Sequence, residues 1–135
     1  MPEQRPEGAA EVAVVVAAHG SRAEAANQAH RDVVDALAEA LGGTVRLPVR
    51  PAFLELAEPT IGDAIDVAAA TGAASVLVVP YFLHPGRHLS DDLPAIVDAA
   101  TARHPGTEIR LLGSFGAEPG LLGVLVAQVA AALAP

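Results

Sequence analysis

The chain has 135 residues and a formal net charge of −8, and 52% of its residues are apolar although only 3% are aromatic. This length predicts one domain whose core is built from valine, leucine, isoleucine and alanine. The acidic balance argues against nucleic acid as a partner, because its recognition needs basic surfaces. The chain has no cysteine, which excludes disulfides, iron–sulfur clusters and thiolate ligands, so a transition metal must be held by His, Asp or Glu.

No targeting segment is visible in the sequence. Residues 1–10, MPEQRPEGAA, lack the basic-then-apolar order of a signal peptide. The apolar runs at 12–18 and 121–134 are too short to cross a bilayer. We therefore expect a cytoplasmic protein without a membrane partner, with a disordered tail at 1–10 and a single domain at 11–135.

Strand-like and helix-like segments alternate along the chain. The first helix is expected to begin near Ser21 and Glu24, which have the spacing of a capping box, and to end at Gly42. Apolar residues follow the helical period along it, at Ala26, Ala29, Val33, Leu37 and Leu41. β-branched apolar clusters bounded by glycine and proline predict strands at 11–18, 44–53, 75–82 and 108–112.

Three more helices are predicted. The second begins at Pro59 or Thr60 and ends at Gly72, and the third runs from Ser90 to about Arg103. The fourth follows the AEPG sequence at 117–120. The alternation predicts an α/β fold, a three-layer sandwich in which helices flank a mainly parallel four-stranded sheet. Right-handed crossovers place the carboxyl ends of such strands along one edge, where ligand sites lie.

Polar side chains follow three of the predicted strands. His19 comes directly after the first strand, Glu55 follows the second, and His84 and His88 lie in a loop after the third. His19, Glu55 and His88 are each about one strand–helix unit apart, so a parallel sheet would bring them to the same edge. Two imidazoles and a carboxylate there would form an open site for a divalent metal.

Structural roles also fit these residues. A histidine at a strand end is often a hydrogen-bonded structural residue, Glu55 could be a solvated loop acid, and an H-x3-H spacing within a loop fixes no geometry. We expect His30 to lie on the polar side of the first helix, at the surface. His104 ends the third helix, where a cation meets the helix dipole favourably, and we interpret it as structural.

Two other interpretations concern Ser21 and the glycines. Ser21 fits the cap of the first helix better than a nucleophile, because no G-x-S-x-G elbow surrounds it. The segments HGSR and HPGRH match neither the P-loop nor the dinucleotide-binding pattern. No motif supports a nucleotide site.

At these residues the sequence resembles the small sirohydrochlorin chelatases of the CbiX/SirB type, which are ATP-independent class II chelatases. The resemblance covers residues 11–133. Its motifs occur in order as HGSR, AFLE, VVPYFLHPGRHLSDDLP and LLGSFGAEPGLLGVL. Each motif alone is weak, and the four in order make a specific match.

The resemblance implies that His19, Glu55 and His88 bind the metal and carry out catalysis, on a chelatase-like half-domain. It implies insertion of Co2+, Fe2+ or Ni2+ into sirohydrochlorin, for cobalamin or sirohaem, with the metal as substrate and no tightly bound cofactor. A homodimer is expected because a class II chelatase is commonly built of two such halves. The residues expected to contact the macrocycle are Ser21, Arg22, Phe53, Leu54, Phe82, Leu83, His84, Gly86 and Arg87.

Two alternatives stay open. A carrier of metal or tetrapyrrole could keep such a site without turnover, although Glu55 and the two histidines provide the proton acceptors that an enzyme needs. A different tetrapyrrole, such as a porphyrin, could also be the substrate. The residue types accept cobalt, iron and nickel alike.

Overall fold

Four parallel strands form the centre of the molecule. The computed structural model of the chain describes residues 11–45, 47–84 and 86–135, without the side chains of 87–89. The tail predicted at 1–10 lies outside the described residues. The sheet has the order β2-β1-β3-β4. Its strands are β1 (Val12–Ala18), β2 (Val49–Phe53), β3 (Ser75–Pro80) and β4 (Glu108–Leu111).

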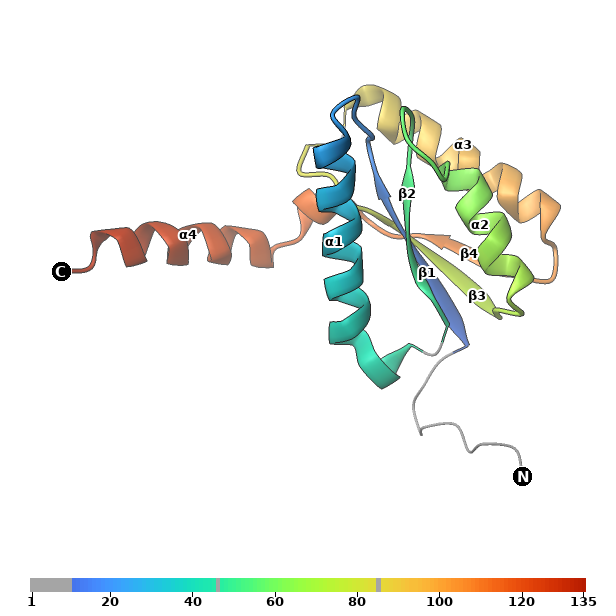
Figure 1. Cartoon of the computed structure of the whole chain (residues 1–135), viewed down its shortest axis with the longest axis horizontal. Helices are drawn as coiled ribbons and strands as arrows, with labels where there is room; N and C mark the ends of the chain where they lie inside the picture. The colour runs from blue at the N-terminus through green and yellow to red at the C-terminus, as the bar shows by residue number, and fades with distance from the viewer. Residues whose placement is uncertain (1–10, 46, 85) are drawn as a thin grey trace.

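Helices cover both faces of this sheet, as the sequence predicts (Figure 1). On one face, α2 (Ile61–Ala70) and α3 (Arg87–Arg103) pack over the larger core cluster, which includes Val15, Val76 and Val78. On the other face, α1 (Glu24–Leu41) places Val34 against Val14 and Val16. The predicted three-layer α/β sandwich is confirmed.

The helix α4 (Gly120–Leu133) departs from the expected sandwich. It begins after the AEPG sequence, as predicted, but it projects away from the sheet instead of covering it (Figure 1). None of its residues is buried.

Most predicted element ends agree with the structure. Thr60 caps α2, because its side chain accepts a hydrogen bond from the backbone N–H of Asp63 (3.2 Å). Gly42 follows the last residue of α1, and Gly72 follows α2 with a φ of +85°. Two starts differ: β2 begins at Val49 rather than at 44, because residues 42–44 form a 3-10 turn, and α3 begins at Arg87, three residues before Ser90.

The prediction for His30 is wrong. His30 is only 6% exposed, and its Nε2 lies 2.9 Å from the Val16 carbonyl oxygen, to which it donates when the ring is neutral. The side of α1 that packs on the sheet runs through Asn27, His30 and Val34, whereas Val33 is 40% exposed. Burial lowers the pKa of His30 below its ordinary value, because the low-dielectric surroundings disfavour the charged ring.

His104 is structural, as predicted, and its partner is a carboxylate. It follows the last residue of α3, and its Nε2 lies 2.7 Å from Oδ1 of Asp66 on α2. Arg103 donates to the same oxygen. The hydrogen bond from His104 is the main cause that holds the pKa of Asp66 below its ordinary value. These contacts tie α2 to the end of α3 that is opposite the carboxyl edge of the sheet.

Candidate functional site

His19 and Glu55 face each other at the carboxyl edge of the sheet. Two hydrogen bonds continue the pairing of β1 with β2 beyond the strand ends: the N–H of Leu54 donates to Ala18 (2.9 Å), and that of Glu55 to His19 (3.1 Å). Nδ1 of His19 therefore lies 3.8 Å from Oε1 of Glu55. Both side chains remain more than half exposed, at 59% and 57%. The sheet thus presents an imidazole and a carboxylate side by side to solvent.

The glycine after His19 permits this approach of the two loops. Gly20 has a φ of +94°, and a Cβ built on it would lie 1.7 Å from the Glu55 carbonyl oxygen. Any side chain at this position would therefore push the Glu55 backbone away. Leu56, the next residue after Glu55, has a φ of +65°, a conformation that non-glycine residues rarely adopt. Such local strain is typical of functional sites.

Asn27 of α1 anchors the turn that carries His19. Its side-chain oxygen accepts from the N–H of Ser21 (2.9 Å), and its Nδ2 donates to the Ser21 carbonyl oxygen (2.8 Å). Ser21 does not cap α1 as predicted: its hydroxyl accepts from the N–H of Ala23 (3.0 Å), and Ala23 is the N-cap, without a side-chain bond. Asn27 is buried, so its two hydrogen bonds with the Ser21 backbone hold the turn from within the folded domain.

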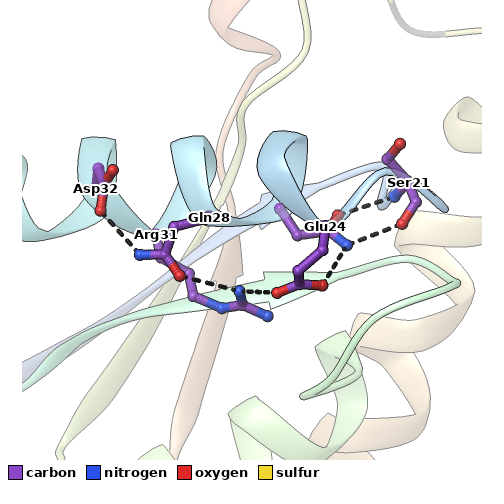
Figure 2. A network of polar contacts seen from close by, with 6 residues as sticks. Ser21, Glu24, Gln28, Arg31 and Asp32 are labelled. Atoms are coloured by element: carbon purple, nitrogen blue, oxygen red, sulfur yellow. Dashed lines mark hydrogen bonds and ion pairs between the residues drawn. The ribbon is translucent and has the colours of Figure 1, made fainter.

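Polar contacts between side chains of α1 extend from this turn along the helix (Figure 2). Glu24 accepts from Arg31 (2.6 Å) and from Asn27 (3.3 Å). The hydrogen bond from Arg31 holds the pKa of Glu24 below its ordinary value. Glu24 is therefore a partner of Arg31 and not the second half of a capping box with Ser21.

An open cavity of about 880 Å³ lies over the His19–Glu55 pair. This volume is at the upper end of the range for small-molecule sites. The ring of Phe82 meets the His19 ring edge-on, with centroids 6.5 Å apart. The residues that line the cavity are His19, Leu54, Glu55, Tyr81, Phe82, Leu83, His84, Gly86 and Asp92.

Several predicted site residues thus meet in one place. His19 and Glu55 come together with Leu54, Phe82, Leu83, His84 and Gly86. Phe53 does not: it has no exposed surface and packs in the core with its ring 5.4 Å from that of His30. The expectation that Phe53 touches the macrocycle is wrong for this conformation, because residues of a strand alternate between faces and Phe53 points inward.

Other predicted site residues stand apart from the cavity. Among the described residues, its lining does not include Ser21 or Arg22, and Arg22 is exposed to solvent. The side chains of Arg87 and His88 lie outside the described part of the structure. Within that part, no group of three His, Asp or Glu side chains is arranged to hold a metal ion. The assignment of His88 as the third ligand therefore stays a prediction.

The sequence analysis missed Asp92 and Asn27. Asp92 lines the cavity from α3, four residues after His88. Positions four apart lie one turn apart on a helix. Because α3 was expected to begin only at Ser90, His88 was placed outside the helix and this spacing gave no prediction for Asp92. Asn27 carried no signal, since its partner Ser21 belongs to a turn whose shape the sequence does not show.

The fold and the geometry of the site together indicate a class of protein. An imidazole and a carboxylate share an open cavity at the carboxyl edge of a parallel sheet, as in α/β proteins that bind a metal or a small ligand there. The CbiX family model matches residues 13–132, which is most of the chain. The chain belongs to the CbiX family, and the resemblance seen in the sequence is confirmed.

Relatives and solved structures agree with this assignment. A chloroplastic sirohydrochlorin ferrochelatase of Arabidopsis thaliana is 34% identical over 112 residues, which span 83% of this chain and 48% of that one. A cobalamin biosynthesis CbiX protein from Marinobacter aquaeolei VT8 matches with a TM-score of 0.67 and 32% identity, over 88% of this chain and 93% of that one.

A third comparison includes a metal. The sirohydrochlorin chelatase SirB from Bacillus subtilis subspecies spizizenii, solved in complex with cobalt, matches with a TM-score of 0.68 and 28% identity, over 87% of this chain and 49% of that one. The chain thus spans about half the length of the Arabidopsis and SirB proteins. Within the described residues, no helix is long and apolar enough to cross a membrane.

Proposed function

We propose that this protein inserts a divalent metal into sirohydrochlorin without ATP, and that the metal is Co2+, Fe2+ or Ni2+. The observation that carries the proposal is the His19–Glu55 pair, 3.8 Å apart, in an open cavity of about 880 Å³. Membership of the CbiX family supports it, as do the named activities of the relatives. The product would serve cobalamin or sirohaem synthesis according to the metal.

The residue types fit the chemistry of metallation. Two pyrrole N–H protons must leave as the metal enters, so the site needs metal ligands and proton acceptors together. An imidazole such as His19 can do either near neutral pH, and the carboxylate of Glu55 can do the same. We assign His88 as the third metal-binding group.

Incomplete ligation suits a metal that must be passed on. A site closed by four thiolates would hold the ion as a structural centre. His19 and Glu55 instead leave most of the coordination sphere to water or to the incoming macrocycle, since both are largely exposed. The metal is therefore a substrate here.

The cavity walls can position the macrocycle. Leu54, Phe82 and Leu83 supply apolar surface, and His84 supplies a polar edge. Glu55 and Asp92 make the cavity acidic, which attracts the cation but repels the carboxylates of the substrate. We propose that Arg22 and Arg87 pair with those carboxylates at the rim and offset this repulsion.

We also propose that the working unit is a homodimer. The chain spans 48% and 49% of the Arabidopsis and SirB proteins, so two copies together have about the length of one such relative.

The experiment is to mix the protein with sirohydrochlorin and each metal in turn, without ATP, and to follow the absorption change. At least one metal should enter faster than in a protein-free control. Equilibrium dialysis with the same metals separates the alternatives. Binding of metal without any acceleration would identify a carrier and overturn the enzyme proposal.

A further inference from the structure

His19 lies in a short stretch of backbone that α1 holds at two points. Before His19, the Val16 carbonyl oxygen lies 2.9 Å from Nε2 of His30. After His19, both backbone groups of Ser21 bond to the side chain of Asn27: the N–H donates to Oδ1 (2.9 Å), and the carbonyl oxygen accepts from Nδ2 (2.8 Å). Because the two points stand on either side of His19, α1 fixes the backbone that carries this ring.

α1 can act as a rigid support because the side that carries these two residues is packed on the sheet. Asn27, His30 and Val34 are 3%, 6% and 0% exposed and are the buried residues of the helix. Val34 belongs to the same core cluster as Val14 and Val16 of β1. A closely packed helix face does not shift without disturbing the core beneath it. The two hydrogen bonds of Asn27 therefore oppose any movement of the turn relative to the sheet.

Position 27 needs a side chain that both donates and accepts. An asparagine amide offers an acceptor oxygen and a donor nitrogen, and the two backbone groups of Ser21 use one each. A second donation from Nδ2 of Asn27, to Glu24 (3.3 Å), favours the same orientation of the amide, because a carboxylate only accepts. Arg31 holds Glu24 in turn (2.6 Å), as Figure 2 shows. An aspartate of the same size would leave the Ser21 carbonyl without its donor.

On its other side the turn meets the loop of Glu55. The Glu55 N–H donates to the His19 carbonyl oxygen (3.1 Å), and Gly20 closely approaches the Glu55 carbonyl oxygen. Movement of the turn would therefore change the separation between the His19 ring and the Glu55 carboxylate, which is 3.8 Å. Both side chains are more than half exposed, so their positions depend chiefly on the backbones that carry them.

We propose that Asn27 is a positioning residue for metal insertion: its side chain holds the turn at Ser21, so that His19 and Glu55 stay within reach of one metal ion. This deepens the proposed function and rests on it for the reaction concerned. Among the described residues, those that line the cavity do not include Asn27, so its effect passes through the turn. Removing the support of a metal ligand typically costs about 10- to 100-fold in metal affinity or activity.

The test compares Asn27→Ala with Val34→Ala in the full-length chain. Both variants truncate a buried side chain of α1, so both should lower the urea concentration at the midpoint of unfolding. Only Asn27 contacts the turn. Titration with Co2+ alone should therefore give a dissociation constant at least about tenfold higher than that of the wild type for Asn27→Ala. Val34→Ala should bind Co2+ as the wild type does.

Two further measurements separate positioning from a merely structural role. At saturating Co2+, kcat for insertion into sirohydrochlorin should fall at least about tenfold in Asn27→Ala, while KM for sirohydrochlorin changes less than about threefold, because the cavity wall is intact. Amide hydrogen exchange needs neither metal nor macrocycle. In Asn27→Ala the Glu55 N–H should exchange at least about tenfold faster. The Tyr81 N–H, which donates to Ala17 ahead of the turn (2.8 Å), should exchange as in the wild type.

Unchanged Co2+ affinity and unchanged Glu55 exchange in folded Asn27→Ala would overturn the positioning proposal. Equal acceleration of exchange at Glu55 and Tyr81, or an equal loss of Co2+ affinity in Val34→Ala, would overturn it as well, because Asn27 would then act only through overall stability. A wild type that binds Co2+ but does not insert it overturns the enzyme proposal alone, and affinity and exchange still decide the role of Asn27.

If Asn27→Ala does not fold, Asn27→Asp replaces it, because it preserves the size of the side chain and the acceptor for the Ser21 N–H. Co2+ should again bind more weakly and the Glu55 N–H should again exchange faster. The added negative charge would by itself attract the cation, so a loss of affinity in Asn27→Asp reports the lost hydrogen bond. Wild-type affinity and exchange in this variant would overturn the proposal.

Discussion

Gly20→Ala should destabilise the fold and displace Glu55 at the same time. The native φ of +94° is unfavourable for alanine, at a cost of about 1–2 kcal/mol. The new Cβ would also lie 1.7 Å from the Glu55 carbonyl oxygen, so the loop after β2 must move. Overpacking of this kind costs about 1–3 kcal/mol. The free energy of unfolding should therefore fall by roughly 2–5 kcal/mol.

Gly72→Ala is the matched control for this variant. Gly72 also has a positive φ, of +85°, but no atom lies within 4 Å of the Cβ position. Its substitution should cost only the backbone term of about 1–2 kcal/mol. The difference between the two variants isolates the contact between the two loops.

Urea unfolding measures both losses, and titration with Co2+ measures the effect on the site. Gly20→Ala should bind Co2+ about tenfold more weakly, in the range seen when the support of a metal ligand is disturbed. Gly72→Ala should bind as the wild type does, because Gly72 lies after α2 at the opposite edge of the sheet. Equal losses of stability in the two variants, with unchanged Co2+ binding in both, would refute the close approach of Gly20 to Glu55.

The remaining predictions concern four residues of the site and its support. His88→Ala should abolish most metallation while His84→Ala retains most of it, measured as initial rates on folded protein; equal damage would show that the ligand assignment is wrong. Glu55→Gln should still bind metal in equilibrium dialysis but insert it slowly, because an amide keeps an oxygen ligand and accepts protons poorly; an unimpaired rate would remove Glu55 from the chemistry. Burial holds the pKa of His30 below 6.5 in the folded chain. As the pH falls through 6.5, the unfolded chain therefore binds a proton at this residue before the folded chain does. Stability is thus fully present above about pH 6.5 and falls as the pH drops below it. The Tm of the wild type should fall more than that of His30→Gln between about pH 7.5 and pH 5.5, and parallel curves would contradict this.

The carboxyl edge of the sheet was predictable because the ends of the first two strands are marked clearly in the sequence. Val14, Val15 and Val16 predict a strand covered on both faces. His19 directly follows this strand, and Glu55 lies two residues after the end of β2. Parallel pairing then places the two residues at the same edge of the sheet, and the close approach of Gly20 to the Glu55 backbone brings their loops together. The structure confirms this convergence.

The predictions that failed depend on contacts between distant segments. Alanines fit the helical period equally well on several sides of α1, so the apolar pattern did not identify the buried side. Asn27 and His30 lie on that side because each finds a backbone partner, at Ser21 and at Val16. A sequence pattern gives no sign of such partners.

The direction of α4 could not be predicted for a similar reason. Its apolar sequence is typical of a buried helix, and the sequence alone does not say which surface buries it. The contacts of Ser114 and Gly116 with the loop after β3 determine where the helix starts. These contacts join segments about 30 residues apart in the chain.

The most direct test of the central claim is the initial rate of Co2+ insertion into sirohydrochlorin by the wild type, by His19→Ala and by His104→Gln. His104 is a histidine at the opposite edge of the sheet, bonded to Asp66 and remote from the cavity. We predict that the wild type and His104→Gln both accelerate insertion well above the protein-free rate, and that His19→Ala does not. An unchanged rate in folded His19→Ala would contradict the claim that the His19–Glu55 cavity is the site of metal insertion.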